Sequence, residues 1–122
     1  MSTNIKCYTS AARTATPTAM ATQKNTKMAR GLLVVIDTTA AGTSPSTTFT
    51  ILGVDPLSGK TWTILASAAI TAVGTVLLRI HPDLTASAGL IAKDVLPAAW
   101  KVTVTHGNGT SHTYSVSAHL LY

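Results

Sequence analysis

The sequence predicts an all-β protein, a single β-sandwich or small barrel of about seven antiparallel strands with an N-terminal arm. The first reason is composition: the 122 residues include 22 Thr, 18 Ala and 10 Ser but no Glu, which favours strands because β-branched side chains suit a pleated sheet. The second is spacing, because short apolar runs alternate with turn residues and show no strand–helix alternation. This length fits one domain, which we divide into an arm at residues 1–30 and a sandwich at residues 31–122.

The arm and the first long strand have different patterns. Pro17 excludes a long helix in the arm, where a short strand is expected near residues 11–16. Residues 32–36 are continuously apolar, so this strand should be covered on both faces or should meet a partner on one.

The next segment predicts a hairpin. After a turn cluster at residues 41–46, residues 47–55 alternate apolar and polar side chains, and residues 60–67 return as a second strand. Pro56 fits the first central position of the connecting turn, and Gly59 supplies a positive φ.

Three further elements complete the sandwich. Residues 75–80 predict a strand, and residues 83–96 predict either a short helical turn or an irregular loop. A second hairpin is expected to join residues 100–104 to residues 114–120, with Gly109 left-handed in a three-residue loop, because an odd-length loop keeps both apolar sets on one face.

The alternating positions also predict the core. Its expected members are Leu33, Val35, Phe49, Ile51, Trp62, Ile64, Val76, Leu78, Trp100, Val102, Val104, Tyr114 and Val116.

The arm concentrates positive charge in a chain of formal net charge +5, because five cations precede the first acid, Asp37. We expect them to attract an acidic partner surface, with the arm adding as a strand to a neighbour's sheet edge. The alternative is a solvated segment that merely lacks acids. Direct nucleic-acid binding is not expected, because Tyr8 is the only aromatic residue in the arm. The predicted partner-binding residues are Lys6, Arg13, Lys24, Lys27 and Arg30.

No catalytic, cofactor or metal site is predicted, so we expect a protein that is not an enzyme. Residues 53–61 fail as a phosphate-binding loop, because five residues instead of four separate the glycines and a strand follows. His106 and His112 should share a face without a third ligand, which favours hydrogen-bonded or exposed histidines over metal binding. No serine lies in a nucleophile elbow, and a hydrolase built on two Asp residues is the remaining enzymatic alternative.

Localisation signals are also weak. Cys7 is the only cysteine, so no intrachain disulfide can form, and pairing between chains stays open. Residues 1–30 contain no apolar core of a signal peptide. Residues 64–80 are interrupted by polar residues and predict two strands around a turn, not a membrane span.

Four segments resemble small structural proteins of tailed bacteriophages, which belong to head-assembly gene clusters and are described as virion or minor capsid proteins. The segments are RGLLVVIDTT at residues 30–39, FTILGVDPLSGK at residues 49–60, TILASAAI at residues 63–70 and WKVTVTHG at residues 100–107. The resemblance covers roughly residues 30–122 and leaves the arm outside. It implies a virion structural role, most readily as a minor capsid or decoration protein on the outside of the shell.

The resemblance also implies a place and partners: the virion after synthesis in the host cytoplasm, and the major capsid protein or other virion subunits. Self-association is predicted separately, because residues 32–36 and a charged fraction of only 11% leave much apolar surface.

Two alternatives to a capsid role remain. One is a carbohydrate-binding or receptor-binding module of a tail or fibre, and the other is a neck or tail structural component. Exposure of both Trp62 and Trp100 would favour the sugar-binding module, whereas burial of both would favour the capsid role.

Overall fold

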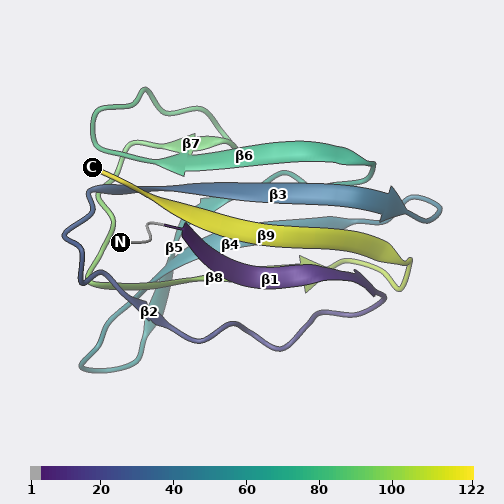
Figure 1. Cartoon of the computed structure of the whole chain (residues 1–122), viewed down its shortest axis with the longest axis horizontal. Coiled ribbons are helices and arrows are strands. Elements are labelled where there is room, and N and C mark those ends of the chain that lie inside the picture. Colours follow the sequence, from purple (N-terminus) through teal and green to yellow (C-terminus); the bar gives the residue numbers. More distant parts are fainter. Residues whose placement is uncertain (1–3) are drawn as a thin grey trace.

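The computed structural model describes residues 4–122, and this part of the chain forms nine strands and no helix (Figure 1). The predicted all-β class is confirmed, although two strands, β2 and β7, contain only two residues each and were not expected. The strands are β1 (Asn4–Arg13), β2 (Gln23–Lys24), β3 (Gly31–Ala41), β4 (Thr47–Val54), β5 (Thr61–Ala66), β6 (Gly74–Ile80), β7 (Ile91–Ala92), β8 (Ala99–His106) and β9 (His112–Leu121).

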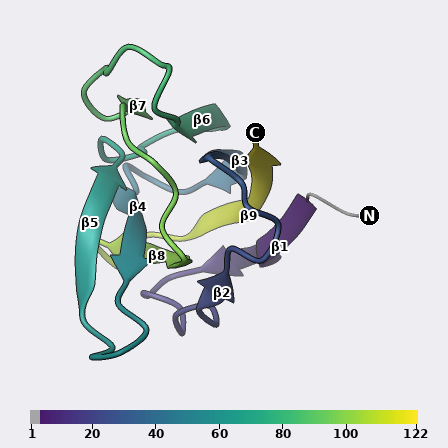
Figure 2. The same ribbon diagram turned by 90° about the vertical axis from the view of Figure 1, so that its left-hand side faces the viewer.

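The strands form two sheets that pack face to face (Figure 2). The five-stranded sheet has the order β1-β9-β3-β6-β7, and the four-stranded sheet has the order β2-β8-β4-β5. All neighbours are antiparallel except β6 and β7. β1 and β7 are therefore the edges of one sheet, and β2 and β5 are the edges of the other.

Most of the predicted core is confirmed. Fully or almost fully buried members are Phe49, Ile51, Leu78, Trp100, Val102, Val104, Tyr114 and Val116.

The predicted phase of β3 was wrong. Leu32, Val34 and Ile36 point into the core with no exposed surface, while Leu33 and Val35 lie on the outer face and are half-buried. The continuous apolar run contains no period-2 signal of its own, so the register with β6 and β9 decides which side faces inward.

In β5 the prediction that Trp62 belongs to the core was also wrong, because 46% of this residue remains exposed at the edge of the sheet. The β4–β5 hairpin itself is confirmed, with Gly59 at a φ of 74° in its turn. Its register shifts between Ile51 and Leu52, which leaves Ile64 half-buried as an extra residue in β5 and brings Leu65 into the core. Val76 in β6 is half-buried too.

The predicted second hairpin was wrong, because β8 and β9 belong to opposite sheets. Both strands do turn their apolar side chains to one core, but they face each other across it instead of pairing side by side. Gly109 is accordingly not among the glycines with a positive φ. Between β6 and β8 the chain forms an irregular loop with the short strand β7, which is one of the two predicted outcomes.

Residues 4–30 lie on the sandwich itself. β1 pairs with β9 from Asn4 opposite His119 to Arg13 opposite His112, so it extends well before the strand expected near residues 11–16. Tyr8 is 8% exposed, and its hydroxyl donates a hydrogen bond of 3.0 Å to the carbonyl of Val102 in the other sheet. The buried Tyr8 ring explains why this basic segment is ordered against its own chain.

Candidate functional site

The five predicted partner-binding cations are spread over two edges and two ends of the sandwich. Lys6 is exposed on β1, whereas Lys24 and Lys27 are exposed in and just after β2. Arg30 precedes β3 at the same end of the sandwich as the chain's C-terminus (Figure 1). Arg13 closes β1 at the opposite end, so the structure does not gather the five cations into one patch.

Arg13 contacts its own chain extensively. Its guanidinium lies 4.6 Å from the centre of the Tyr114 ring and 5.9 Å from that of Tyr8. It also donates hydrogen bonds to the main-chain carbonyls of Thr9 at 2.7 Å, Ala11 at 3.2 Å and Tyr114 at 3.0 Å. The contact with the Tyr114 ring and the hydrogen bond to the Tyr114 carbonyl hold the end of β1 against β9, while the other two bonds lie within β1.

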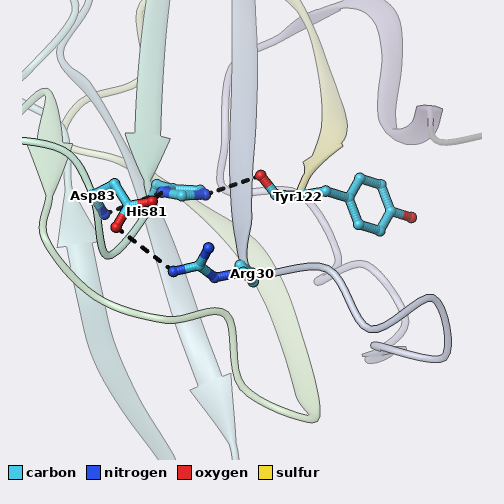
Figure 3. A network of polar contacts seen from close by, with 4 residues as sticks. All are labelled: Arg30, His81, Asp83 and Tyr122. Atoms are coloured by element: carbon cyan, nitrogen blue, oxygen red, sulfur yellow. Dashed lines mark hydrogen bonds and ion pairs between the residues drawn. The ribbon is translucent and has the colours of Figure 1, made fainter.

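Arg30 takes part in a small polar network at the other end, drawn in Figure 3. Its Nη2 lies 3.6 Å from Oδ1 of Asp83, with both side chains more than half exposed, so this ion pair adds little stability. The main-chain N–H of Asp83 donates to Nδ1 of His81 at 3.1 Å, which leaves Nε2 of His81 to donate to the carbonyl of Tyr122 at 3.3 Å. The network ties the end of β6 to the end of β9, and it partly neutralises Arg30.

Two of the lysines lie at surface pockets. Lys24 lines an open pocket of about 440 Å³ whose apolar side is formed by Val54, Pro56, Ala98 and Ala99. A second pocket, of about 390 Å³, lies where β1 changes register against β9, and Lys6 and Tyr8 are among the residues that line it. Each of these two pockets places one of the predicted cations beside a concave surface.

The most connected polar cluster is buried between the sheets. His112 in β9 has no exposed surface, and its ring nitrogens lie 2.9 Å from the Thr38 hydroxyl and 2.8 Å from the Thr47 hydroxyl. Thr38 lies in β3 and Thr47 in β4, so the imidazole joins the two sheets. A threonine–histidine pair is also the chemistry of an activated hydroxyl, but no more than 1% of any of these residues is exposed, so substrate has no access. This histidine therefore has a structural role.

A second histidine extends the cluster toward solvent. Nε2 of His106 lies 2.9 Å from the Tyr114 hydroxyl, and its ring centre is 6.4 Å from that of His112. The expected proximity of these histidines is thus seen, although they come from opposite sheets. Within residues 4–122 no group of three or more His, Cys, Asp or Glu side chains is placed to hold a metal ion.

The buried imidazole predicts an acid-sensitive fold. Burial, and then the neighbouring His106, lower the pKa of His112 below its usual value of 6.5. The unfolded chain therefore binds the proton more readily, so stability is greatest above about pH 6.5 and decreases below it, by at most about 1.4 kcal/mol per pH unit for this group. Burial also lowers the pKa of His106, which acts in the same direction.

Urea unfolding at pH 7.5 and pH 5.0 measures this effect. The pH range from 5.0 to 7.5 lies above the range in which Asp55 titrates, because the hydrogen bonds of Asp55 to Ser58 and Leu57 lower the pKa of this carboxyl below 3.8. His112→Gln should reduce the pH dependence, while His119→Gln on the outer face should preserve it. Equal or greater stability of the natural chain at pH 5.0 would contradict the prediction.

Cys7 is placed poorly for bonding between chains. Burial raises the pKa of its thiol to about 12, and its Sγ lies 3.9 Å from the carbonyl of Ile5. A half-buried thiol with this pKa reacts slowly near neutral pH, because the thiolate is the reactive form.

Sequence reasoning missed one exposed region on β5 and the turn before it. Trp62 lies over Gly53 of β4, where a Cβ atom would overlap the indole ring, and Leu57 in the turn is 93% exposed. The exposure of Leu57 could have been inferred from its place in a Pro-Leu-Ser-Gly turn. Nothing in the local sequence indicated that Trp62 lies on an edge strand, where its ring is only partly covered.

The fold defines the chain as an all-β protein of two packed sheets. The described residues contain no helix suited to crossing a membrane. No family model matches the chain, and neither the curated proteins nor the solved structures searched contain a match.

Proposed function

We propose that this chain is a non-enzymatic structural protein of a tailed-phage virion, a minor capsid or decoration protein that attaches to the outside of the shell. The phage and capsid part of the proposal rests on the resemblance of the segments at residues 30–39, 49–60, 63–70 and 100–107. The assembly role rests on the outer face of the five-stranded sheet. Strand β3 has apolar side chains on both of its faces, and those on the outer face are directed to solvent.

The sheet register groups these side chains. Val35 pairs with Leu77 of β6 and with Ser117 of β9, while Leu33 pairs with Arg79 and His119. Paired residues share a face of the sheet, and Leu33, Val35 and Leu77 are all only half-buried. We call these three residues the outer apolar patch.

Positive charge borders the outer apolar patch. Lys6 pairs with Ser117 and so lies in the same row as Val35, and Arg79 lies beside Leu33. The one acid on the neighbouring row, Asp37, accepts a hydrogen bond of 3.3 Å from Thr75. An apolar centre with a basic border fits a flat partner surface with acidic groups, such as another virion subunit.

Co-sedimentation with capsids of the phage that encodes the chain tests the proposal. Leu33→Thr combined with Val35→Thr removes the apolar centre and keeps residues that suit a strand. Burying an aliphatic side chain contributes about 1.5–3 kcal/mol, so we expect at least a tenfold weaker attachment. Val73→Thr changes a valine that is 62% exposed in the loop before β6 and should have no effect.

Salt dependence separates the charges from the apolar patch. Lys6→Ala should weaken attachment modestly and flatten its decrease with salt, because exposed cations act collectively and are screened. A protein that stays in the supernatant while capsids sediment would contradict the capsid role.

The two tryptophans are neither both exposed, which would favour the sugar-binding module, nor both buried, which would favour the capsid role. Trp100 has no exposed surface, whereas 46% of Trp62 is exposed. Because only one of the two tryptophans reaches solvent, we do not adopt the carbohydrate-binding alternative.

A further inference from the structure

The free edge of β5 has the features of a pairing surface. β5 is the last strand of the four-stranded sheet in the described part of the chain, and residues 61–66 contain no charged residue and no proline. Natural edge strands are commonly protected by charges and irregular pairing. β1, the other long edge strand, has this protection in Lys6, Arg13 and two register shifts, whereas β5 has one register shift and no charge.

Hydrogen bonding at the turn shows which groups of β5 are available. The main-chain N–H of Asp55 donates to the carbonyl of Lys60 at 2.8 Å, so these two form a hydrogen-bonded pair. Such pairs alternate along an antiparallel ladder, which makes Gly53 and Trp62 the next hydrogen-bonded pair. The main-chain groups of Thr61 and Thr63 therefore point away from β4, toward the open edge, and both residues are exposed.

Trp62 stands between these two threonines as a fixed apolar surface. Its indole lies over Gly53, where only a glycine leaves room for the ring, and 46% of the residue is exposed. A large aromatic side chain that is already held in place loses little conformational freedom when a partner covers it.

The two ends of this edge complement each other. Leu57 is 93% exposed and belongs to the turn that joins β4 to β5. This turn lies at one end of β5 (Figure 2). Past the other end lies an open apolar pocket of about 400 Å³, lined by residues that include Ala68, Ile70, Val76 and Leu90. Leu57 precedes Trp62 by five positions, and Ser67, where this pocket begins, follows it by five.

We propose that two copies of the chain pair antiparallel through β5 about a two-fold axis at Trp62. This register sets Thr61 of each copy opposite Thr63 of the other and joins the two four-stranded sheets. It also directs Leu57 of each copy toward the pocket of the other. The inference rests on the proposed function as an assembly subunit, because it assigns the surface through which copies associate.

A second copy fits this edge for two reasons. Antiparallel self-pairing opposes no like charges, because β5 has none. The projecting Leu57 and the receiving pocket occupy opposite ends of one edge, as an isologous contact requires.

Sedimentation velocity over a concentration series tests the pairing. We expect the natural chain to dimerise as its concentration rises. Thr63→Pro removes only an N–H that points away from β4, and Leu57→Asp places a charge in the pocket. Each should weaken dimerisation at least about tenfold without changing the fold. Met28→Asp is the matched control, because Met28 is 85% exposed in the loop after β2, on the opposite edge of the sheet.

A charge pair tests the register itself. Thr61→Lys with Thr63→Lys places like charges opposite each other and should weaken the dimer, whereas Thr61→Glu with Thr63→Lys should restore it. A natural chain that stays monomeric, or a dimer that resists both Thr63→Pro and Leu57→Asp, would overturn the inference.

Capsid binding separates this inference from the proposed function. If Thr63→Pro abolishes the dimer while the protein still sediments with capsids, both proposals hold. If the natural chain is monomeric and still attaches through the outer apolar patch, only the β5 pairing fails. If it dimerises through β5 and ignores capsids, only the capsid role fails.

Discussion

Replacing Trp100 with Ala is expected to lower the free energy of unfolding by about 3–5 kcal/mol, as removal of a fully buried aromatic side chain does. Trp100 has no exposed surface and belongs to β8, an inner strand of the four-stranded sheet. It pairs with Gly53 on one side and Gln23 on the other, and neither glycine nor an edge glutamine can fill the space that the indole leaves. The lost burial and the remaining cavity therefore add.

Urea denaturation followed by circular dichroism measures this loss. Trp100→Phe is the informative companion, because the indole Nε1 is buried without a hydrogen-bond partner among the described residues. The phenylalanine keeps most of the apolar volume and removes an unpaired donor, so its cost should be well below that of Trp100→Ala. A loss below about 1 kcal/mol for Trp100→Ala would contradict the packing described for this layer.

The β3 phase error shows where a sequence pattern contains information. Residues 32–36 are all apolar, so they contain no alternation of apolar and polar residues that would show which side chains face the core. The next residue, Asp37, lies on the outer face with Leu33 and Val35, and extending the strand to this charge would have predicted the correct phase. The expectation that this strand is covered on both faces or meets a partner on one stays a prediction.

The β8–β9 error has a different origin. Two strands whose apolar side chains face one core can lie side by side in one sheet or opposite each other in two. The local sequence fits both, and the loop at residues 107–111 is long enough to cross the roughly 10 Å between sheets. Only the pairing of β9 with β1 and β3 decides the matter, and those partners lie far away in the sequence.

The sequence showed which residue types could contact a partner, but it did not show where in the fold these residues lie. A basic N-terminal quarter is visible in the composition, but the stacking of Arg13 on Tyr114 joins residues 101 positions apart. The exposure of Trp62 follows from its place on an edge strand, and nothing in the local sequence shows which strand lies at an edge. Non-local register therefore limited the prediction of the site more than chemistry did.

Deleting residues 1–13 is expected to destabilise the sandwich by at least about 4 kcal/mol, which combines the loss of a buried aromatic side chain with the loss of a complete edge strand. β1 covers β9 along most of its length, and the Tyr8 ring is part of the hydrophobic core. The Tyr8 hydroxyl also donates to Val102 and accepts from the N–H of Met20 at 3.2 Å. The deletion would leave β9 with a bare edge and Val102 without this donor.

Urea titrations of two point variants provide stability losses with which the loss caused by the deletion can be compared. Tyr8→Phe keeps the ring and should cost about 1 kcal/mol for its hydrogen bonds, while Lys6→Ala, on the exposed side of β1, should change stability by less than about 0.5 kcal/mol. An unchanged urea midpoint for the shortened chain would show that β1 adds nothing to the fold. Because the deletion removes structure together with charge, the electrostatic role of Lys6, Lys24 and Lys27 has to be tested by substitution in the full chain.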